Sequence, residues 1–66
     1  MNMKNNIKEL RKSLNIRQED LANIVNVTRQ TINAIENNKY DPTLELAMKL
    51  GKIFDKHVDE IFNLSD

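Results

Sequence analysis

The sequence has no cysteine, a single histidine, and only one glycine and one proline among its 66 residues. Without cysteine there are no disulfides and no thiolate metal ligands, which fits a reducing compartment. The lone His57 cannot form a metal site by itself, and one glycine cannot build a glycine-rich phosphate loop. With so few turn-forming residues, the chain is expected to be helical rather than built from strands and turns.

Long apolar runs are also missing, since no more than three apolar residues follow one another. A membrane-spanning helix needs about 20, so no membrane contact is expected. The first ten residues, MNMKNNIKEL, lack the apolar segment of a secretory signal, and a cytoplasmic protein is expected. No Ser/His/Asp set and no carboxylate pair typical of a cleft is visible, which argues against an enzyme, a cofactor and a small-molecule ligand.

Neither sign of charge predominates, because ten basic and ten acidic residues give a formal net charge of +0. This balance argues neither for nor against a nucleic-acid partner, since the local distribution of charge decides that. The length predicts one small domain over 1–66, with marginal stability. Because no disulfide or metal can support it, self-association is the remaining source of stability, and a homodimer is expected.

Apolar residues recur at helical spacing along nearly the whole chain, which predicts an all-α fold. Asn26 tolerates the left-handed conformation that ends a helix, and Thr28 and Thr43 are predicted to cap the third and fourth helices. The short break around Asn26 predicts a helix-turn-helix over about 18–37. The expected helices cover about 5–14, 18–25, 29–37, 44–54 and 58–62.

Arg11 and Glu36 are charged residues on otherwise apolar helix faces; the face that holds Arg11 is expected to bury Ile7, Leu10 and Leu14. Either both charged residues lie at the edge of the apolar stripe and reach water, or they pair between the first and third helices. A buried acid and a buried arginine need one another, and removing one partner costs roughly 3–5 kcal/mol. The pairing is the favoured interpretation, because it would lock the third helix against the first.

The opposite face of the third helix is polar and carries no acid. At 100° per residue, Arg29, Gln30, Asn33 and Asn37 fall within one arc. Arginine can donate two hydrogen bonds to guanine, and glutamine or asparagine can bind adenine through a donor and an acceptor. An acid in this arc would be repelled by phosphate. The face is therefore interpreted as a DNA-reading surface, although an ordinary polar surface would use the same residue types.

These motifs together resemble the Cro/repressor-type, XRE-like family of helix-turn-helix transcription regulators. The resemblance covers about 5–62 and depends on Gln18-Glu19-x-Leu21-Ala22, Val27-Thr28-Arg29-Gln30-Thr31-Ile32, Ile35-Glu36 and Pro42. It is strongest to minimal single-domain members similar to the small cytolysin repressor. It implies a five-helix, lambda-repressor-like DNA-binding domain that binds a pseudo-palindromic operator as a dimer.

The resemblance also implies roles for individual residues. It places the base-reading contacts at Arg29, Gln30 and Asn33, and the Arg11–Glu36 pair has counterparts in relatives. Two departures stand out: Asn26 replaces a frequent glycine, and Arg17 replaces a Ser or Thr cap, at a cost of about 1 kcal/mol. The residues expected at the DNA backbone are Gln18, Thr28, Thr31, Asn37, Lys39, Tyr40 and Arg17.

The C-terminal part holds more apolar residues than one small core needs, which predicts a dimerisation region over about 44–66. The alternative is that all of them pack within one chain. The resemblance to the small repressor further suggests a short antiparallel ribbon between 2–4 and 62–65. The expected interface residues are Leu44, Met48, Val58, Ile61, Phe62 and Leu64.

Two functions fit this sequence. The first is a sequence-specific transcription regulator, a dimeric repressor that occludes a promoter on double-stranded DNA. The second is an antitoxin-like or other protein-interaction module of the same fold, whose main task would be to sequester a partner protein. The sequence lacks a long tail that could wrap such a partner, which favours the regulator.

Overall fold

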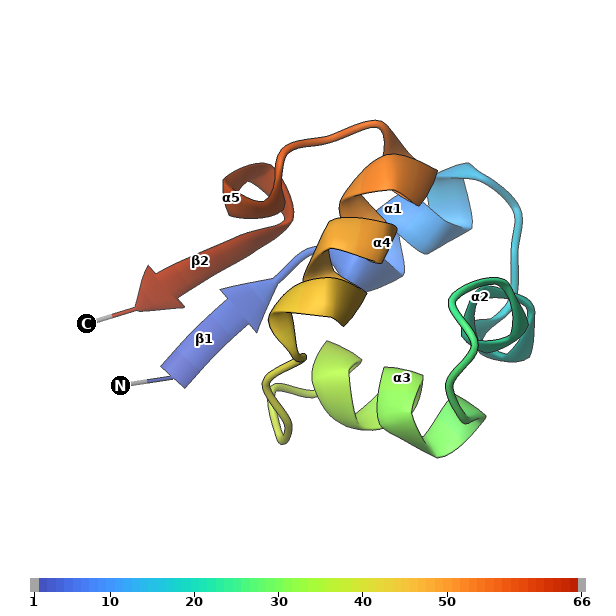
Figure 1. Cartoon of the computed structure of the whole chain (residues 1–66), viewed down its shortest axis with the longest axis horizontal. Helices are drawn as coiled ribbons and strands as arrows, with labels where there is room; N and C mark the ends of the chain where they lie inside the picture. The colour runs from blue at the N-terminus through green and yellow to red at the C-terminus, as the bar shows by residue number, and fades with distance from the viewer. Residues whose placement is uncertain (1, 66) are drawn as a thin grey trace.

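The computed structural model describes residues 2–65, in which five helices are flanked by two short strands (Figure 1). This confirms the expected five-helix, lambda-repressor-like arrangement with a terminal ribbon. None of the helices over 2–65 is long and apolar enough to cross a membrane. The elements are β1 (Asn2–Asn5), α1 (Ile7–Ser13), α2 (Gln18–Ile24), α3 (Arg29–Glu36), α4 (Leu44–Phe54), α5 (Val58–Ile61) and β2 (Phe62–Ser65).

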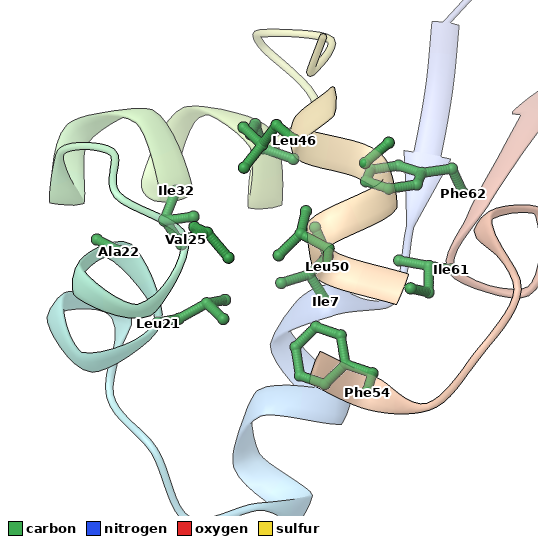
Figure 2. Close-up of a cluster of buried hydrophobic side chains, with 12 residues drawn as sticks. Ile7, Leu21, Ala22, Val25, Ile32, Leu46, Leu50, Phe54, Ile61 and Phe62 are labelled. Carbon is green, nitrogen blue, oxygen red and sulfur yellow. The ribbon is translucent and has the colours of Figure 1, made fainter. Parts of the chain in front are cut away.

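The core lies between the helices and receives apolar side chains from each of them. Figure 2 shows Ile7 of α1 and Leu50 of α4 near its centre, with α2 and α3 on one side and α5 on the other. Both residues are fully buried, as are Leu21, Ile32 and Ile61. The apolar residues that recur at helical spacing therefore pack into one core. Its members are Ile7, Leu21, Ala22, Val25, Ile32, Ile35, Leu46, Ala47, Leu50, Phe54, Ile61 and Phe62.

The turn between α2 and α3 follows from two residues identified in the sequence. Asn26 has a left-handed backbone conformation, with φ of 62°. The backbone amide of the following residue, Val27, donates to the Ala22 carbonyl at 2.9 Å. Thr28 then caps α3, because its hydroxyl accepts from the Thr31 amide at 3.1 Å. The chain turns sharply here, so α3 runs along the lower edge of the molecule in Figure 1.

After each of four helices, a residue other than glycine adopts the left-handed backbone conformation. Asn15, Asn26, Asn38 and Asp55 all have φ between 53° and 62°, a conformation that Asn and Asp tolerate better than most residues. This use of Asn and Asp explains how the chain manages with one glycine. That glycine, Gly51, is needed for a close approach, because a Cβ there would lie 2.9 Å from the Lys56 carbonyl oxygen.

The terminal strands pair antiparallel, with Asn5 opposite Phe62 and Met3 opposite Leu64. This confirms the expected ribbon and shortens two predicted helices. The Asn5 side chain accepts from the Ile7 amide at 3.1 Å, so α1 begins at Ile7 rather than at 5. Helix α5 ends at Ile61, and Phe62 starts β2.

Three apolar residues differ from the expectation. Ile61 and Phe62 were expected at a dimer interface, but both are buried in the core of the single chain. For these two residues the structure therefore agrees with the alternative, in which the apolar residues pack within one chain. Leu14, expected on the buried face of α1, is 50% exposed, because α1 ends at Ser13 and Leu14 lies beyond its regular face.

Candidate nucleic-acid interface

The outer face of α3 carries the three predicted base-reading residues side by side. Arg29, Gln30 and Asn33 are all exposed and border one shallow hollow of ≈ 300 Å³. The first turn of α3 contains no acid, so nothing there offsets the positive field of the helix N-terminus. This face combines hydrogen-bond donors and acceptors with net positive charge.

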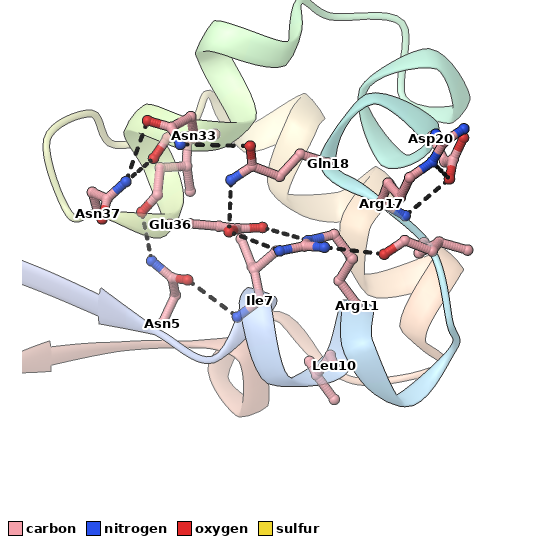
Figure 3. A network of polar contacts seen from close by, with 12 residues as sticks. Asn5, Ile7, Leu10, Arg11, Arg17, Gln18, Asp20, Asn33, Glu36 and Asn37 are labelled. Atoms are coloured by element: carbon pink, nitrogen blue, oxygen red, sulfur yellow. Dashed lines mark hydrogen bonds and ion pairs between the residues drawn. The ribbon is translucent and has the colours of Figure 1, made fainter.

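The single acid of α3 points away from that face and is neutralised. Arg11 of α1 donates to the Glu36 carboxylate from Nε at 2.8 Å and from Nη2 at 3.3 Å (Figure 3). The two side chains are only 10% and 3% exposed, respectively. Arg11 Nη1 also donates to the Ile16 carbonyl at 3.0 Å. The structure thus forms the predicted pair, which ties α3 to α1 and to the segment after α1.

A second donor to Glu36 comes from the start of α2. Gln18 Nε2 donates to Glu36 Oε1 at 3.0 Å, while Gln18 Oε1 accepts from Asn33 Nδ2 at 3.5 Å. Asn37 Nδ2 in turn donates to the Asn33 carbonyl oxygen at 2.8 Å and to its Oδ1 at 3.3 Å. A network of hydrogen bonds therefore connects the ion pair, through the side-chain amides of Gln18, Asn33 and Asn37, to the exposed face of α3, as Figure 3 shows.

The sequence did not reveal the contact between Gln18 and Glu36. The only available signal was chemical, because a carboxylate has room for more donors than one arginine supplies. The resemblance implied a DNA-backbone contact for Gln18, but it did not identify Glu36 as the residue that Gln18 contacts.

Arg17, at the N-cap of α2, is exposed and paired with acids. Its guanidinium lies 3.2 Å from Glu19 and 3.3 Å from Asp20. The Arg17 amide donates to the Asp20 carboxylate at 2.9 Å. This hydrogen bond, together with the one from the guanidinium, lowers the pKa of Asp20, while the Asp20 carboxylate raises the pKa of Arg17. Asp20 thus supplies part of the capping that Arg17 lacks.

The remaining predicted backbone contacts surround α3. Arg17, Gln18 and Arg29 border a common hollow of ≈ 390 Å³ beside the start of α3. The Thr28 hydroxyl already accepts from the Thr31 amide as the cap of α3, and it also lies 3.0 Å from the Thr31 hydroxyl. Beyond the other end of α3, the loop residues Asn37, Lys39 and Tyr40 are exposed. The structure therefore leaves a polar surface along α3 and at both of its ends.

Three exposed apolar side chains lie on α4 and β2. Leu44, Met48 and Leu64 are 73%, 54% and 70% exposed, respectively. Leu44 and Met48 border a hollow of ≈ 370 Å³ with Glu45, Lys49 and Lys52. Val58 is partly buried against the core. No group of His, Asp and Glu that could hold a metal occurs within the described part of the chain.

Comparisons with known proteins agree with this geometry. The profile of the helix-turn-helix family matches residues 7–61. An uncharacterised HTH-type transcriptional regulator from Methanocaldococcus jannaschii is 50% identical over 97% of both chains. The HTH-type regulator YgzD of Bacillus subtilis is 45% identical over the same share of each.

A solved structure supports the fold independently. The crystal structure of a candidate DNA-binding protein from Bacteroides fragilis superposes with a TM-score of 0.80 at 23% identity, covering 92% of this chain and 98% of that one. The family profile and the two regulators carry the assignment beyond the fold. The chain therefore belongs to the Cro/repressor-type helix-turn-helix family of DNA-binding transcriptional regulators, which are not enzymes.

Proposed function

We propose that this regulator is a dimeric, sequence-specific repressor that places α3 in the major groove of a pseudo-palindromic operator. The observation that carries the proposal is the separation of charge on α3. The side chain of its one acid, Glu36, is 3% exposed and bound by Arg11, whereas Arg29, Gln30 and Asn33 are exposed. A helix that presents only neutral and basic groups can approach DNA without repulsion from phosphate.

The three exposed side chains have the chemistry of direct base reading. Arg29 can donate to both O6 and N7 of guanine, and Gln30 and Asn33 can each donate to N7 and accept from N6 of adenine. They lie in the first two turns of α3, the part of a recognition helix that contacts base edges in this class of motif.

Phosphate contacts would flank these base contacts. Arg17 and Gln18 lie at the start of α2 and share a hollow with Arg29, while Lys39 and Tyr40 are exposed beyond the end of α3. Such contacts fix the register of the protein on the duplex and carry no sequence information themselves. The proposed backbone set is Arg17, Gln18, Thr28, Thr31, Asn37, Lys39 and Tyr40.

Two copies would read two half-sites about 34 Å apart. The exposed Leu44 and Met48 of α4, with the edge of Val58, supply apolar contacts for this pairing, and the exposed Leu64 of β2 supplies a further one. We place the regulator in the minimal single-domain subgroup similar to the small cytolysin repressor, because the relatives from two organisms align over 97% of their own length.

Selection of bound duplexes from a random library tests the proposal, followed by fluorescence anisotropy on the selected duplex. Arg29→Ala should cost about 1–3 kcal/mol of binding free energy at one base position and relax the preference there. Lys39→Ala should weaken binding to all duplexes alike. Equal losses for Arg29→Ala on selected and random duplexes would refute base reading. Recovery of no preferred duplex, with a partner protein copurifying, would favour the antitoxin-like alternative.

A further inference from the structure

The buried carboxylate of Glu36 determines how Gln18 is oriented. A carboxylate bound by arginine offers only acceptor oxygens, so a neighbouring amide must turn its NH2 group toward it. Gln18 does so, donating from Nε2 to Glu36 Oε1 at 3.0 Å. Because the acceptor is charged, this hydrogen bond is stronger than one between neutral groups. The carbonyl oxygen of Gln18 is thereby fixed on the opposite side of its amide.

That carbonyl oxygen then constrains the next amide. Gln18 Oε1 can only accept, so Asn33 must present its NH2 group, which it does at 3.5 Å. Asn33 Oδ1 consequently faces Asn37, which donates to it from Nδ2 at 3.3 Å. All donors in this chain of amides point toward the carboxylate. The orientation originates in a side chain that is 3% exposed and yet extends to the exposed face of α3.

We propose that Glu36 is a specificity-determining positioning residue, which sets through Gln18 the hydrogen-bonding polarity that Asn33 presents to a base. The inference rests on the proposed function of α3. In the observed orientation, Asn33 retains one free N–H and one free lone pair on Oδ1, the combination that adenine requires. We expect Glu36 itself to make no DNA contact, because its side chain is 3% exposed and bound by Arg11 and Gln18.

Replacing the carboxylate by an amide would remove this constraint. Glu36→Gln keeps the shape of the side chain but adds an NH2 donor, so Gln18 can rotate by half a turn and accept from it. Gln18 would then offer its NH2 group to Asn33, whose own amide would turn and exchange its donor with its acceptor. The residue at the DNA surface would be unchanged, but its hydrogen-bonding pattern would no longer be unique.

The first experiment measures base preference rather than overall affinity. Asn33→Ala identifies the base pair that Asn33 reads on the selected duplex, and Arg29→Ala identifies a different one as a control. Glu36→Gln should reduce the preference at the Asn33 base pair by about tenfold, within the range of one bidentate contact. The preference at the Arg29 base pair should remain within about twofold of the unsubstituted protein.

Gln18→Met is the matched variant in case Glu36→Gln does not fold, because it leaves the Arg11–Glu36 pair intact. It should lower affinity for all duplexes and, in addition, reduce the preference at the Asn33 base pair. A uniform loss with that preference unchanged would overturn the inference while leaving the proposed function standing. If the unsubstituted protein selects no duplex at all, the proposed function itself has failed.

The second experiment observes the amides directly in the protein without DNA. In ¹⁵N-correlated spectra, Glu36→Gln should shift the side-chain NH2 signals of both Gln18 and Asn33. The Asn23 side chain, exposed on α2 and outside this network, should keep its signals. A shift confined to Gln18 would show that the orienting effect stops before the DNA surface and would overturn the proposal.

Discussion

Asn26 carries the backbone conformation on which the helix-turn-helix depends. With φ of 62°, it occupies a region where a Cβ collides with the backbone and only Gly, Asn and Asp are common. Asn26→Ala should therefore lower the free energy of unfolding by about 1 kcal/mol, whereas Asn26→Gly should stay within about 0.5 kcal/mol of the original. Urea denaturation measures both.

Asn23→Ala provides the control for this pair of variants, because Asn23 is exposed within the regular part of α2. It should leave stability nearly unchanged. If Asn26→Ala were as stable as Asn26→Gly, the left-handed conformation would not be what the turn requires from this residue.

The ion pair between Arg11 and Glu36 leads to a second prediction about single residues. Arg11→Met leaves the Glu36 carboxylate with only the Gln18 donor in a site that is 3% exposed. This should reduce the free energy of unfolding by about 3–5 kcal/mol. The double variant Arg11→Met/Glu36→Leu should regain most of that loss, because no unpaired charge remains. Thermal and urea unfolding of the single and double variants would show it.

Equal destabilisation by the single and the double variant would contradict this account. It would mean that the lost packing of the two side chains, rather than the unpaired carboxylate, controls stability. The double variant also removes the charged acceptor of Gln18, so its DNA preference should be weakened even where its stability is restored.

The elements of the fold were predictable to different degrees. Helix α3 was placed nearly in full, because Thr28 and the spacing of Ile32 and Ile35 act locally. The start of α1 was placed two residues early, because Asn5 pairs with Phe62 far along the chain. The hydrogen bond from Gln18 to Glu36 was not predictable, since it depends on how closely α2 approaches α3 in space.

The fourth helix offers a prediction at the scale of an element. Thr43 caps α4 by accepting from the Leu46 amide at 3.2 Å, and α4 delivers Leu50 and Phe54 to the core. Thr43→Ala should cost about 1 kcal/mol of unfolding free energy, whereas Thr43→Ser should cost much less because it keeps the hydroxyl. Urea denaturation distinguishes them, and similar losses for both variants would rule out capping as the cause.

For the whole molecule, the exposed apolar surface of α4 predicts association. Leu44→Glu combined with Met48→Glu should convert a dimer into a folded monomer, because both side chains are exposed and contribute little to the core of one chain. Linking two half-site contacts raises avidity by about 10²–10⁴, so affinity for a full operator should fall by at least ~100-fold. Sedimentation velocity and anisotropy measure the two effects.

Ile24→Glu serves as the control, since Ile24 is an exposed apolar residue on α2 that does not border the hollow of Leu44 and Met48. It should leave the oligomeric state unchanged. A monomeric unsubstituted protein at micromolar concentration would contradict the proposed dimer. The sequence identified the exposed Leu44, Met48 and Leu64 correctly as surplus apolar residues, but it could not separate them from Ile61 and Phe62, because burial depends on the completed fold.

The ribbon of β1 and β2 has a consequence for the order in which the chain folds. It joins Met3 to Leu64, which are separated by most of the chain, and closing so long a loop costs more entropy than closing the short α2–α3 turn. Local contacts therefore have a kinetic advantage. We expect α2 and α3 to pack together early and β1 and β2 to pair last. Amide hydrogen exchange should therefore be fastest in β1 and β2.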